Sequence, residues 1–366
     1  MKIGINILYL IPGKVGGTET YARELLSALT KEIKSGDELV IFCGRETTKT
    51  LSSLSKATIV TLPIYSANRP ARIVAEQTIL PWLCYKYKVD ALFSLGYSAP
   101  FIHPFKSIVT IHDLNWYYHP EDFSRVQQFV WHWLTVISAK TANHIIAIST
   151  ATAHSLMQVM QISKDHISII LHGAPVASKS AKLPNTSNNP YIFSVLAGYP
   201  HKNLITLLQA FNQLHQIYPK LNLVICGLSG RSDKMNAEYI QENNLANNVQ
   251  ILGYVSQSKL EKLYRNAIVF VFPSAYEGFG IPVIESMYYG VPIVSANSSS
   301  LAEVVSYGGC LVDTFSVDQY VKEITLLLDD RKAREILIKN GRKRILELTW
   351  EKTANKTLNI LKKISS

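Results

Sequence analysis

The sequence predicts an α/β protein of two domains, each built on a parallel sheet. The chain has 366 residues and is 47% hydrophobic, which is enough for two cores of ordinary domain size. Short apolar runs alternate with amphipathic segments in both halves, a pattern typical of parallel strands joined by helices. Residues 177–190 are rich in Ser, Lys, Asn and Pro without periodicity, which indicates a linker. The predicted domains are therefore residues 1–176 and 191–348.

The first half opens with an apolar strand followed by a glycine-containing loop. Gly16 and Gly17 let the backbone approach a ligand closely, but no Gly-Lys-Ser/Thr follows, so the loop is not a P-loop. A helix is expected to follow Thr18 as its N-cap, and a helical region over 69–87 is expected to be interrupted at Pro81. The strands predicted in this half are 2–10, 39–43, 58–62, 90–94, 107–111, 142–149 and 167–172.

The second half repeats the alternation of strands and helices. Its predicted strands are 191–196, 221–226, 249–252, 267–272 and 291–296. Amphipathic helices are expected at 256–265, 318–328, 331–347 and 350–364. A strand, a glycine-rich loop, a helix and a further strand over 267–296 predict parallel strands with a right-handed crossover.

The loop of this unit is the stretch on which the functional prediction depends. Gly278 and Gly280 loosen the backbone, Pro282 suits the first helical position, and Gly290 ends the short helix. The N–H groups of residues 279–283, apart from the proline, are expected to point out of the helix N-terminus, where they favour a phosphate.

Two carboxylates bracket that predicted phosphate site. Glu277 precedes the helix and Glu285 lies one turn inside it. Carboxylates beside a phosphate suit the hydroxyl groups of a sugar and a ribose. The alternative is a simple strand–helix turn with one capping Glu and one exposed Glu.

Glu277 and Glu285, with Gly-Phe-Gly-Ile-Pro between them, resemble the signature of the retaining glycosyltransferases of family 4, in particular their mannosyltransferase-like group. The resemblance covers nearly the whole chain, most firmly 191–350. It implies the GT-B fold, in which two Rossmann-like domains face each other across a cleft. It also implies that the last helix, 349–366, packs back on the N-terminal domain.

The resemblance implies roles for three catalytic candidates. Glu277 is expected to hold the hydroxyls of the donor sugar, and Lys202, after the first strand of the second domain, to meet the diphosphate. His112 ends a predicted strand, where parallel sheets bind ligands, and relatives place this His near the transferred sugar. The alternatives are a surface Lys at a helix start and a structural His hydrogen-bonded in a loop.

The resemblance also implies a set of donor-binding residues. Glu285 is expected to bind the ribose diol, and the loop after the second-domain strand 249–252 to meet the nucleobase through its backbone. The donor-binding residues predicted in this way are Gly17, Gly253, Tyr254, Val255, Gly278, Phe279, Gly280, Ile281 and Glu285.

The expected reaction is transfer of a hexose from a nucleoside diphosphate sugar to a glycan or lipid-linked acceptor of a surface polysaccharide. GDP-mannose is the favoured donor and a UDP-sugar the alternative. The chain departs from the family at Ala197, where many members have Arg, and at His172, where they have Asn. An inactive nucleotide-sugar-binding subunit therefore remains as an alternative. A nucleotide-sugar epimerase on the same scaffold is a second alternative, against which the spacing of Glu277 and Glu285 argues.

Composition sets the remaining expectations. No Asp-x-Asp cluster and no His/Cys ligand set is visible, so no metal or other cofactor is expected. The four cysteines have no paired spacing and indicate reduced thiols in a cytosolic protein. The sequence shows no signal peptide and no apolar run long enough to span a bilayer. Five aromatic residues downstream of His112 are expected to be mostly core, with some lining an acceptor pocket: Trp116, Tyr117, Tyr118, Trp131 and Trp133.

The net charge of +10 is unevenly distributed. Residues 1–180 carry 17 Lys/Arg and 12 Asp/Glu, residues 181–330 carry 9 and 12, and residues 331–366 carry 11 and 3. If the last helix returns to the first domain, the basic segments share one lobe. Such a lobe suits an anionic membrane surface rather than a nucleic acid, and predicts a cytoplasmic protein that visits the inner membrane. The alternative is a merely solubilising surface.

Overall fold

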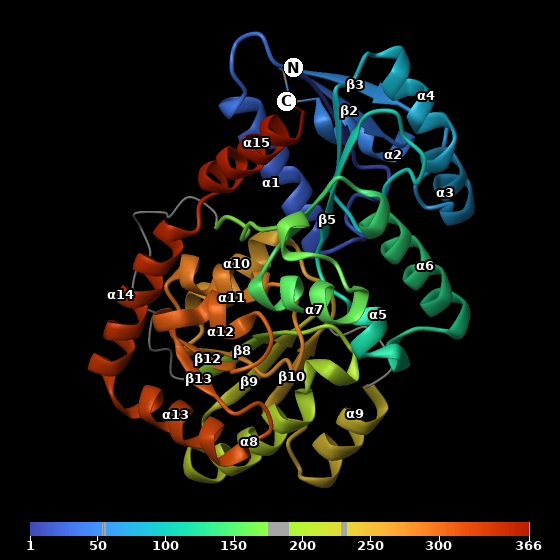
Figure 1. Ribbon diagram of the computed structural model, residues 1–366. Helices are drawn as coiled ribbons and strands as arrows, with labels where there is room; N and C mark the ends of the chain where they lie inside the picture. The colour runs from blue at the N-terminus through green and yellow to red at the C-terminus, as the bar shows by residue number, and fades with distance from the viewer. Residues whose placement is uncertain (53, 55, 175–189, 228–232, 366) are drawn as a thin grey trace. The chain divides into compact units, whose positions relative to one another are not determined.

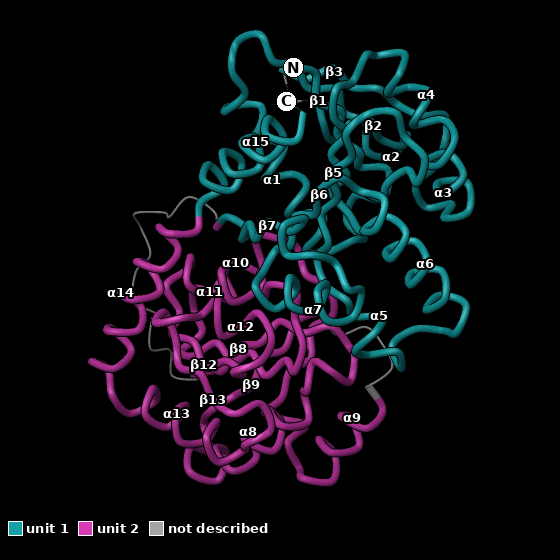
Figure 2. The backbone as a smooth tube through the Cα atoms, in the orientation of Figure 1, with its two compact units in different colours: residues 1–173, 349–366 teal, residues 174–348 magenta. Residues whose placement is uncertain are grey.

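A computed structural model describes residues 1–52, 54, 56–174, 190–227 and 233–365 of the chain. The chain forms two compact units, shown in Figure 2. Unit 1 comprises Met1–Gly173 together with Thr349–Ser366, and unit 2 comprises Ala174–Leu348. The last helix therefore belongs to unit 1. Nearly all of the predicted linker, 177–190, lies outside the described residues.

Unit 1 is built on a seven-stranded parallel sheet with the strand order β3-β2-β1-β4-β5-β6-β7 (Figure 1). The strands are β1 (Lys2–Asn6), β2 (Glu38–Cys43), β3 (Ala57–Thr61), β4 (Ala91–Ser94), β5 (Lys106–Ile111), β6 (His144–Ala147) and β7 (Ile167–Ile169). The order reverses between β1 and β4, which makes the carboxyl ends of these two strands the switch point where such sheets bind ligands. The predicted parallel sheet is confirmed.

Helices cover both faces of this sheet. They are α1 (Gly17–Glu32), α2 (Arg45–Thr48), α3 (Arg69–Gln77), α4 (Ile79–Lys86), α5 (Asn115–Tyr118), α6 (Arg125–Thr141), α7 (Thr150–Met160) and α15 (Trp350–Ser365), with 3₁₀ turns at Lys49–Leu51, Pro120–Asp122 and Lys164–His166. Phe93 and Ile108, partners on β4 and β5, pack with α1 and α15. Their neighbours Leu92 and Val109 face the other way, toward α3–α4 and α6–α7. The helices α3, α4 and α6 thus share one face of the sheet.

A cluster of three aromatic rings fastens α15 to the rest of unit 1. The centroids of Tyr21, His172 and Trp350 lie 4.6 Å (Tyr21–His172), 5.8 Å (His172–Trp350) and 6.1 Å (Tyr21–Trp350) apart. Gly173 follows, and a Cβ atom there would lie 2.2 Å from the backbone nitrogen of Trp350. The contact between the two chain segments therefore requires glycine.

Unit 2 is built on a six-stranded parallel sheet with the order β10-β9-β8-β11-β12-β13. Its strands are β8 (Tyr191–Val195), β9 (Asn222–Cys226), β10 (Val249–Leu252), β11 (Val269–Phe272), β12 (Ile293–Ala296) and β13 (Cys310–Val312). Its helices are α8 (Leu204–Ile217), α9 (Asp233–Glu242), α10 (Gln257–Asn266), α11 (Ile281–Tyr289), α12 (Leu301–Val305), α13 (Val317–Asp329) and α14 (Arg331–Glu347), with 3₁₀ turns at Pro200–Lys202 and Ser306–Gly308. The switch point of this sheet lies between β8 and β11.

Two sequence-based expectations about helix ends are wrong. The first helix begins at Gly17 rather than after Thr18, because Gly16, with φ of 58°, takes the cap position and the Thr18 hydroxyl donates to the Val15 carbonyl instead. The predicted break at Pro81 falls four residues earlier, since α3 ends at Gln77. A proline ring clashes with the carbonyl of the residue four positions before it, while its missing N–H costs nothing in the first turn of α4.

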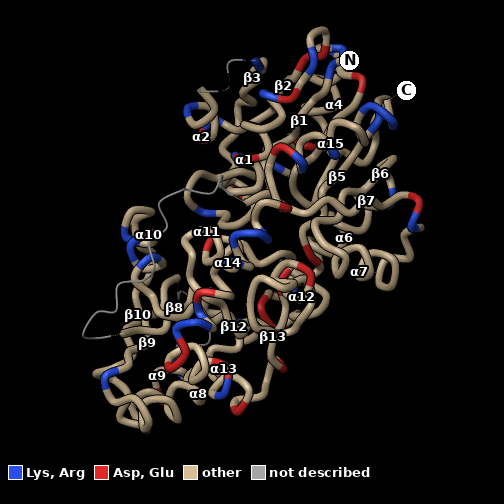
Figure 3. The backbone as a smooth tube through the Cα atoms, turned by 90° about the vertical axis from the view of Figure 1, so that its left-hand side faces the viewer, with Lys and Arg blue, Asp and Glu red and all other residues tan. Residues whose placement is uncertain are grey.

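The charge distribution differs from the expectation for the basic tail. Of the 11 Lys/Arg in 331–366, seven lie on α14, which belongs to unit 2. Unit 1 carries 20 Lys/Arg and 13 Asp/Glu, and unit 2 carries 17 and 14. Figure 3 shows charged residues along both units. The tail charge therefore does not gather on one lobe.

Two further properties bear on the expectations from composition. Three of the four thiols, those of Cys43, Cys84 and Cys226, are buried, and Cys310 is half-buried; none forms a disulfide. Among the described helices, none combines the length and the apolarity needed to cross a membrane.

Candidate functional site

Lys202 and Glu277 lie in the loops that follow β8 and β11, the two strands that flank the switch point of unit 2. The Lys202 Nζ atom donates to the Glu277 Oε1 atom over 2.8 Å. The two side chains are only 16% and 15% exposed, so the pair is partly shielded from water. The fold thus brings two predicted catalytic residues, 75 positions apart in the chain, into direct contact.

Serine hydroxyls hold the backbone of Glu277. Its N–H donates to the Ser299 Oγ atom over 2.9 Å, and its carbonyl accepts from the hydroxyls of Ser299 and Ser300. The Ser298 hydroxyl donates to the Ser274 carbonyl in the same loop. The sequence showed a run of three serines before a helix, but gave no signal that it positions Glu277.

Asn203 anchors the loop that contains Lys202 through hydrogen bonds to backbone carbonyls. It has the left-handed conformation, with φ of 55°, and its side-chain amide donates to the carbonyls of Pro273 and Thr314. Pro273 directly follows β11, so Asn203 joins the two loops that carry the ion pair. Sequence reasoning missed this residue.

The N-terminus of α11 has the predicted glycine loop, with two corrections. Gly280 has φ of 98°, and a Cβ atom there would lie 2.6 Å from the Leu301 side chain, so glycine is required. The helix begins at Ile281, which makes Pro282 its second residue. The Val283 N–H donates to the Gly280 carbonyl, so it does not point outward for a phosphate. The Val283 amide is therefore removed from the predicted set.

Glu285 is not a fully exposed helix residue, as the alternative of a simple strand–helix turn would require. It is partly buried, and the Tyr264 hydroxyl donates to its Oε2 atom over 3.0 Å. Burial raises the pKa of Glu285, and the hydrogen bond from Tyr264 acts in the opposite direction. The hydrogen bond from Tyr264 occupies one of the two carboxylate oxygens.

The residues Gly253, Tyr254 and Val255 follow β10, at the edge of the sheet. The strand β9 separates β10 from β8, so these residues are not in the switch-point cluster. The Gly253 carbonyl accepts from the Gly227 N–H, and the Tyr254 side chain is 85% exposed. Because the strands are parallel, this loop lies at the same carboxyl end of the sheet as Lys202 and Glu277.

In unit 1, His112 directly follows β5 and is buried. Its Nε2 atom lies 2.8 Å from the Leu95 carbonyl oxygen, which only accepts, so Nε2 carries the proton. Burial lowers the pKa of His112 to about 4, and the ring is therefore neutral at pH 7, with an accepting lone pair on Nδ1. Tyr21 packs edge-on against the ring at 4.9 Å. Gly17, the other predicted residue of unit 1, is exposed at the start of α1.

Glu76 is a buried carboxylate at the switch point of unit 1. It accepts from the Asn6 side-chain amide over 2.6 Å and from the Ser98 hydroxyl over 2.8 Å. Burial raises the pKa of Glu76. The neighbouring Gln77 bonds to the backbone of Ala99. These contacts hold the loop after β4, which neighbours the loop between β1 and Gly17 because β4 pairs with β1.

The aromatic residues downstream of His112 are mostly not core. Only Trp116 is buried, whereas Tyr117, Tyr118 and Trp133 are 50%, 39% and 48% exposed and Trp131 is intermediate. Trp133 is exposed because the first half of α6 faces solvent, whereas Tyr117 and Tyr118 lie on the one-turn helix α5.

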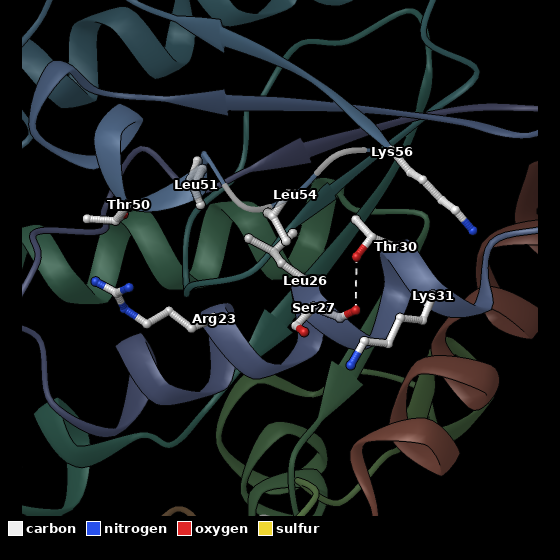
Figure 4. A pocket seen from close by; sticks show the side chains of 9 residues that line it. All are labelled: Arg23, Leu26, Ser27, Thr30, Lys31, Thr50, Leu51, Leu54 and Lys56. Carbon is white, nitrogen blue, oxygen red and sulfur yellow. Dashed lines mark hydrogen bonds between the residues drawn. The ribbon is translucent and has the colours of Figure 1, made fainter.

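A hollow of about 340 Å³ lies elsewhere on unit 1 (Figure 4). It contains none of the predicted site residues. Its lining combines apolar side chains with hydroxyls and three cations: Arg23, Leu26, Ser27, Thr30, Lys31, Thr50, Leu51, Leu54 and Lys56.

Comparisons with known proteins cover both halves of the chain. The family "Glycosyl transferases group 1" matches residues 176–344, and "Glycosyltransferase Family 4" matches residues 15–177. The chain is 28% identical to O-antigen chain mannosyltransferase B of Escherichia coli, over 70% of both chains. It is 26% identical to O-antigen chain mannosyltransferase RfbU of Salmonella typhimurium, over 90% of this chain and 88% of that one. The structure of Anabaena Alr3699/HepE in complex with UDP-glucose matches 99% of this chain and all of the other, with a TM-score of 0.75 at 18% identity.

Proposed function

Because the chain belongs to the GT-B glycosyltransferases, with a group 1 half and a family 4 half, we propose that it transfers a hexose with retention from a nucleoside diphosphate sugar. Mannose is the favoured sugar and GDP-mannose the favoured donor, since two relatives are O-antigen chain mannosyltransferases. The proposed acceptor is a glycan or a lipid-linked intermediate of a surface polysaccharide. A UDP-sugar is the alternative donor, because the HepE structure contains UDP-glucose.

The observation that carries this proposal is the pair of Lys202 and Glu277 at the switch point of unit 2. In the reaction, the bond between the sugar C1 and the diphosphate oxygen breaks, and an acceptor oxygen bonds to C1 and passes its proton to the departing diphosphate. Negative charge develops on the leaving diphosphate, where a positioned cation stabilises the transition state. Lys202 would supply that cation, together with the amides of residues 278–281.

The pairing of Lys202 with Glu277 suggests how the two side chains would rearrange when the sugar nucleotide binds. A diphosphate carries more charge than a carboxylate, so it would draw Lys202 away from Glu277. The Glu277 carboxylate would then accept hydrogen bonds from the sugar hydroxyls. Glu285 would bind the ribose diol through the carboxylate oxygen that Tyr264 does not occupy. The Nδ1 atom of His112 would accept a hydrogen bond from a sugar hydroxyl. Since Lys202 provides the charge, we propose that transfer needs no divalent metal.

A panel of sugar nucleotides tests the proposal. Purified protein is mixed with GDP-mannose, UDP-glucose, UDP-galactose or ADP-glucose, and the thermal shift and the release of nucleoside diphosphate are measured. GDP-mannose should raise the melting temperature most and should be hydrolysed slowly or transferred. Binding without any turnover would favour a non-catalytic binding subunit, and no response to any donor would contradict the proposed function.

A further inference from the structure

The outer surface of α6 carries an apolar stripe that faces solvent. Val126, Phe129, Val130 and Trp133 follow the three- and four-residue spacing of one helix face, and are 73%, 63%, 37% and 48% exposed. The opposite face packs on the sheet through Leu134, Thr135, Ser138 and Ala139, which are buried. An amphipathic helix normally turns its apolar stripe inward, so an outward stripe indicates a partner.

The stripe continues onto α3 and α4, which cover the same face of the sheet. Val74, Trp82 and Tyr85 on these helices are 61%, 58% and 76% exposed, and Ile102 in the adjoining loop is 87% exposed. Ala99 connects the two regions, since its carbonyl accepts from Gln77 at the end of α3 and its N–H donates to Ser138 of α6. We call this surface, with its eight exposed apolar residues on α3, α4, α6 and the loop at 102, the α3–α4–α6 face.

The charges on the same three helices are almost all positive. Their basic residues are Arg69, Arg72, Lys86, Arg125 and Lys140. Their one acidic residue, Glu76, is 3% exposed and points into unit 1 toward Asn6. Lys86 lies over the Trp82 ring at 5.2 Å, which keeps cation and aromatic ring together at the surface.

We propose that the α3–α4–α6 face docks on an anionic lipid bilayer. Helices that lie in a bilayer interface combine an apolar face with Lys and Arg, and Trp and Tyr suit the level of the headgroups. Anionic headgroups complement the four exposed cations Arg69, Lys86, Arg125 and Lys140, each of which contributes roughly 1 kcal/mol near such a surface. A second copy of the chain is the weaker candidate, because a two-fold contact would set the same cations against one another.

This inference deepens the proposed function, since it rests on a lipid-linked acceptor at the inner face of the membrane. It does not depend on the charge of the C-terminal segment 331–366, which is divided between the two units. Docking would hold unit 1 against the surface in which such an acceptor is anchored. The structure assigns the contact to named side chains, and these can be changed without touching Glu277, Lys202 or His112.

Flotation with vesicles tests the apolar part of the proposal. Wild type should float with phosphatidylglycerol-containing vesicles at low salt, but not with phosphatidylcholine alone, and should dissociate as salt rises. The double variant Phe129→Ser, Trp133→Ser should reduce partitioning by about tenfold or more, because it removes two inserted aromatic side chains. The control is Phe315→Ser in unit 2, whose side chain is 69% exposed, and it should float like wild type.

Charge reversal tests the electrostatic part. Lys86→Glu with Arg125→Glu should abolish flotation, while Lys332→Glu with Lys339→Glu on α14 changes the net charge equally and should leave it intact. An equal loss of flotation in the two charge-reversal double variants would overturn the proposal. So would a wild-type protein that does not float. A dimer by light scattering that Phe129→Ser, Trp133→Ser makes monomeric would assign the face to a second copy. The vesicles contain no acceptor, so donor turnover, measured separately, tests the transferase assignment independently.

Discussion

The ion pair at the switch point of unit 2 allows a quantitative prediction. Replacing Lys202 by Met keeps the aliphatic stem but leaves the Glu277 carboxylate, which is 15% exposed, without its cation at 2.8 Å. An unpaired, partly buried charge costs about 1–3 kcal/mol of unfolding free energy. Glu277→Gln likewise leaves the Lys202 ammonium group without its carboxylate partner. The double variant removes both charges, so the two single costs should not add, and the coupling energy should be about 1–3 kcal/mol.

The assay is urea unfolding followed in two ways. All five tryptophans lie in unit 1, so their fluorescence follows that unit, whereas far-UV circular dichroism follows both. The matched control is the Arg331–Glu335 pair of α14, which is 72% and 43% exposed and should show a coupling of only about 0.3–0.5 kcal/mol. If the Lys202–Glu277 coupling is no larger than that of the control, the pair does not hold the two loops as the structure indicates.

Four further predictions follow from single features. Glu285→Ala should weaken binding of the nucleoside diphosphate by about 1.5–3 kcal/mol in calorimetry, the range for a hydrogen bond to a charged group, and unchanged affinity would remove its ribose role. The pKa of His112 is about 4 in the folded protein against about 6.5 unfolded, so the unfolding free energy should fall by up to about 3 kcal/mol from pH 6.5 to 4. His112→Gln should lose that slope, whereas replacing the exposed His154 should not. Gly173→Ala should cost about 1–3 kcal/mol by overpacking, while Gly253→Ala, with no atom within 4 Å of its new Cβ, should be neutral. EDTA should leave donor turnover unchanged, and an absolute need for Mg²⁺ or Mn²⁺ would show a metal role that the sequence did not reveal.

The strands of both sheets were predictable from the sequence because buried parallel strands are near-continuous apolar runs. The exception is β13, Cys310–Val312, whose apolar run has only three residues. The spacing of Glu277 and Glu285 likewise indicated a site, since both lie within one short segment. Contacts that hold them were not predictable, because Ser299 and Tyr264 are each more than twenty residues away in the chain.

The orientation of α6 shows a second limit of sequence reasoning. Periodicity tells which residues share a helix face, but an exposed apolar stripe has the same period as a buried one. Trp133 therefore looked like a core residue. Only the packing of Ser138 and Ala139 on the sheet shows that the stripe faces outward.

The most direct test of the central claim is the rate at which purified protein releases nucleoside diphosphate from its preferred sugar nucleotide. Wild type is compared with Glu277→Ala, after circular dichroism confirms that the variant is folded. The account predicts turnover by wild type and a loss of roughly a hundredfold or more in the variant, the scale for a preorganised transition-state contact. Equal rates in the two proteins would contradict the assignment of Glu277, and with it the site proposed at the switch point of unit 2.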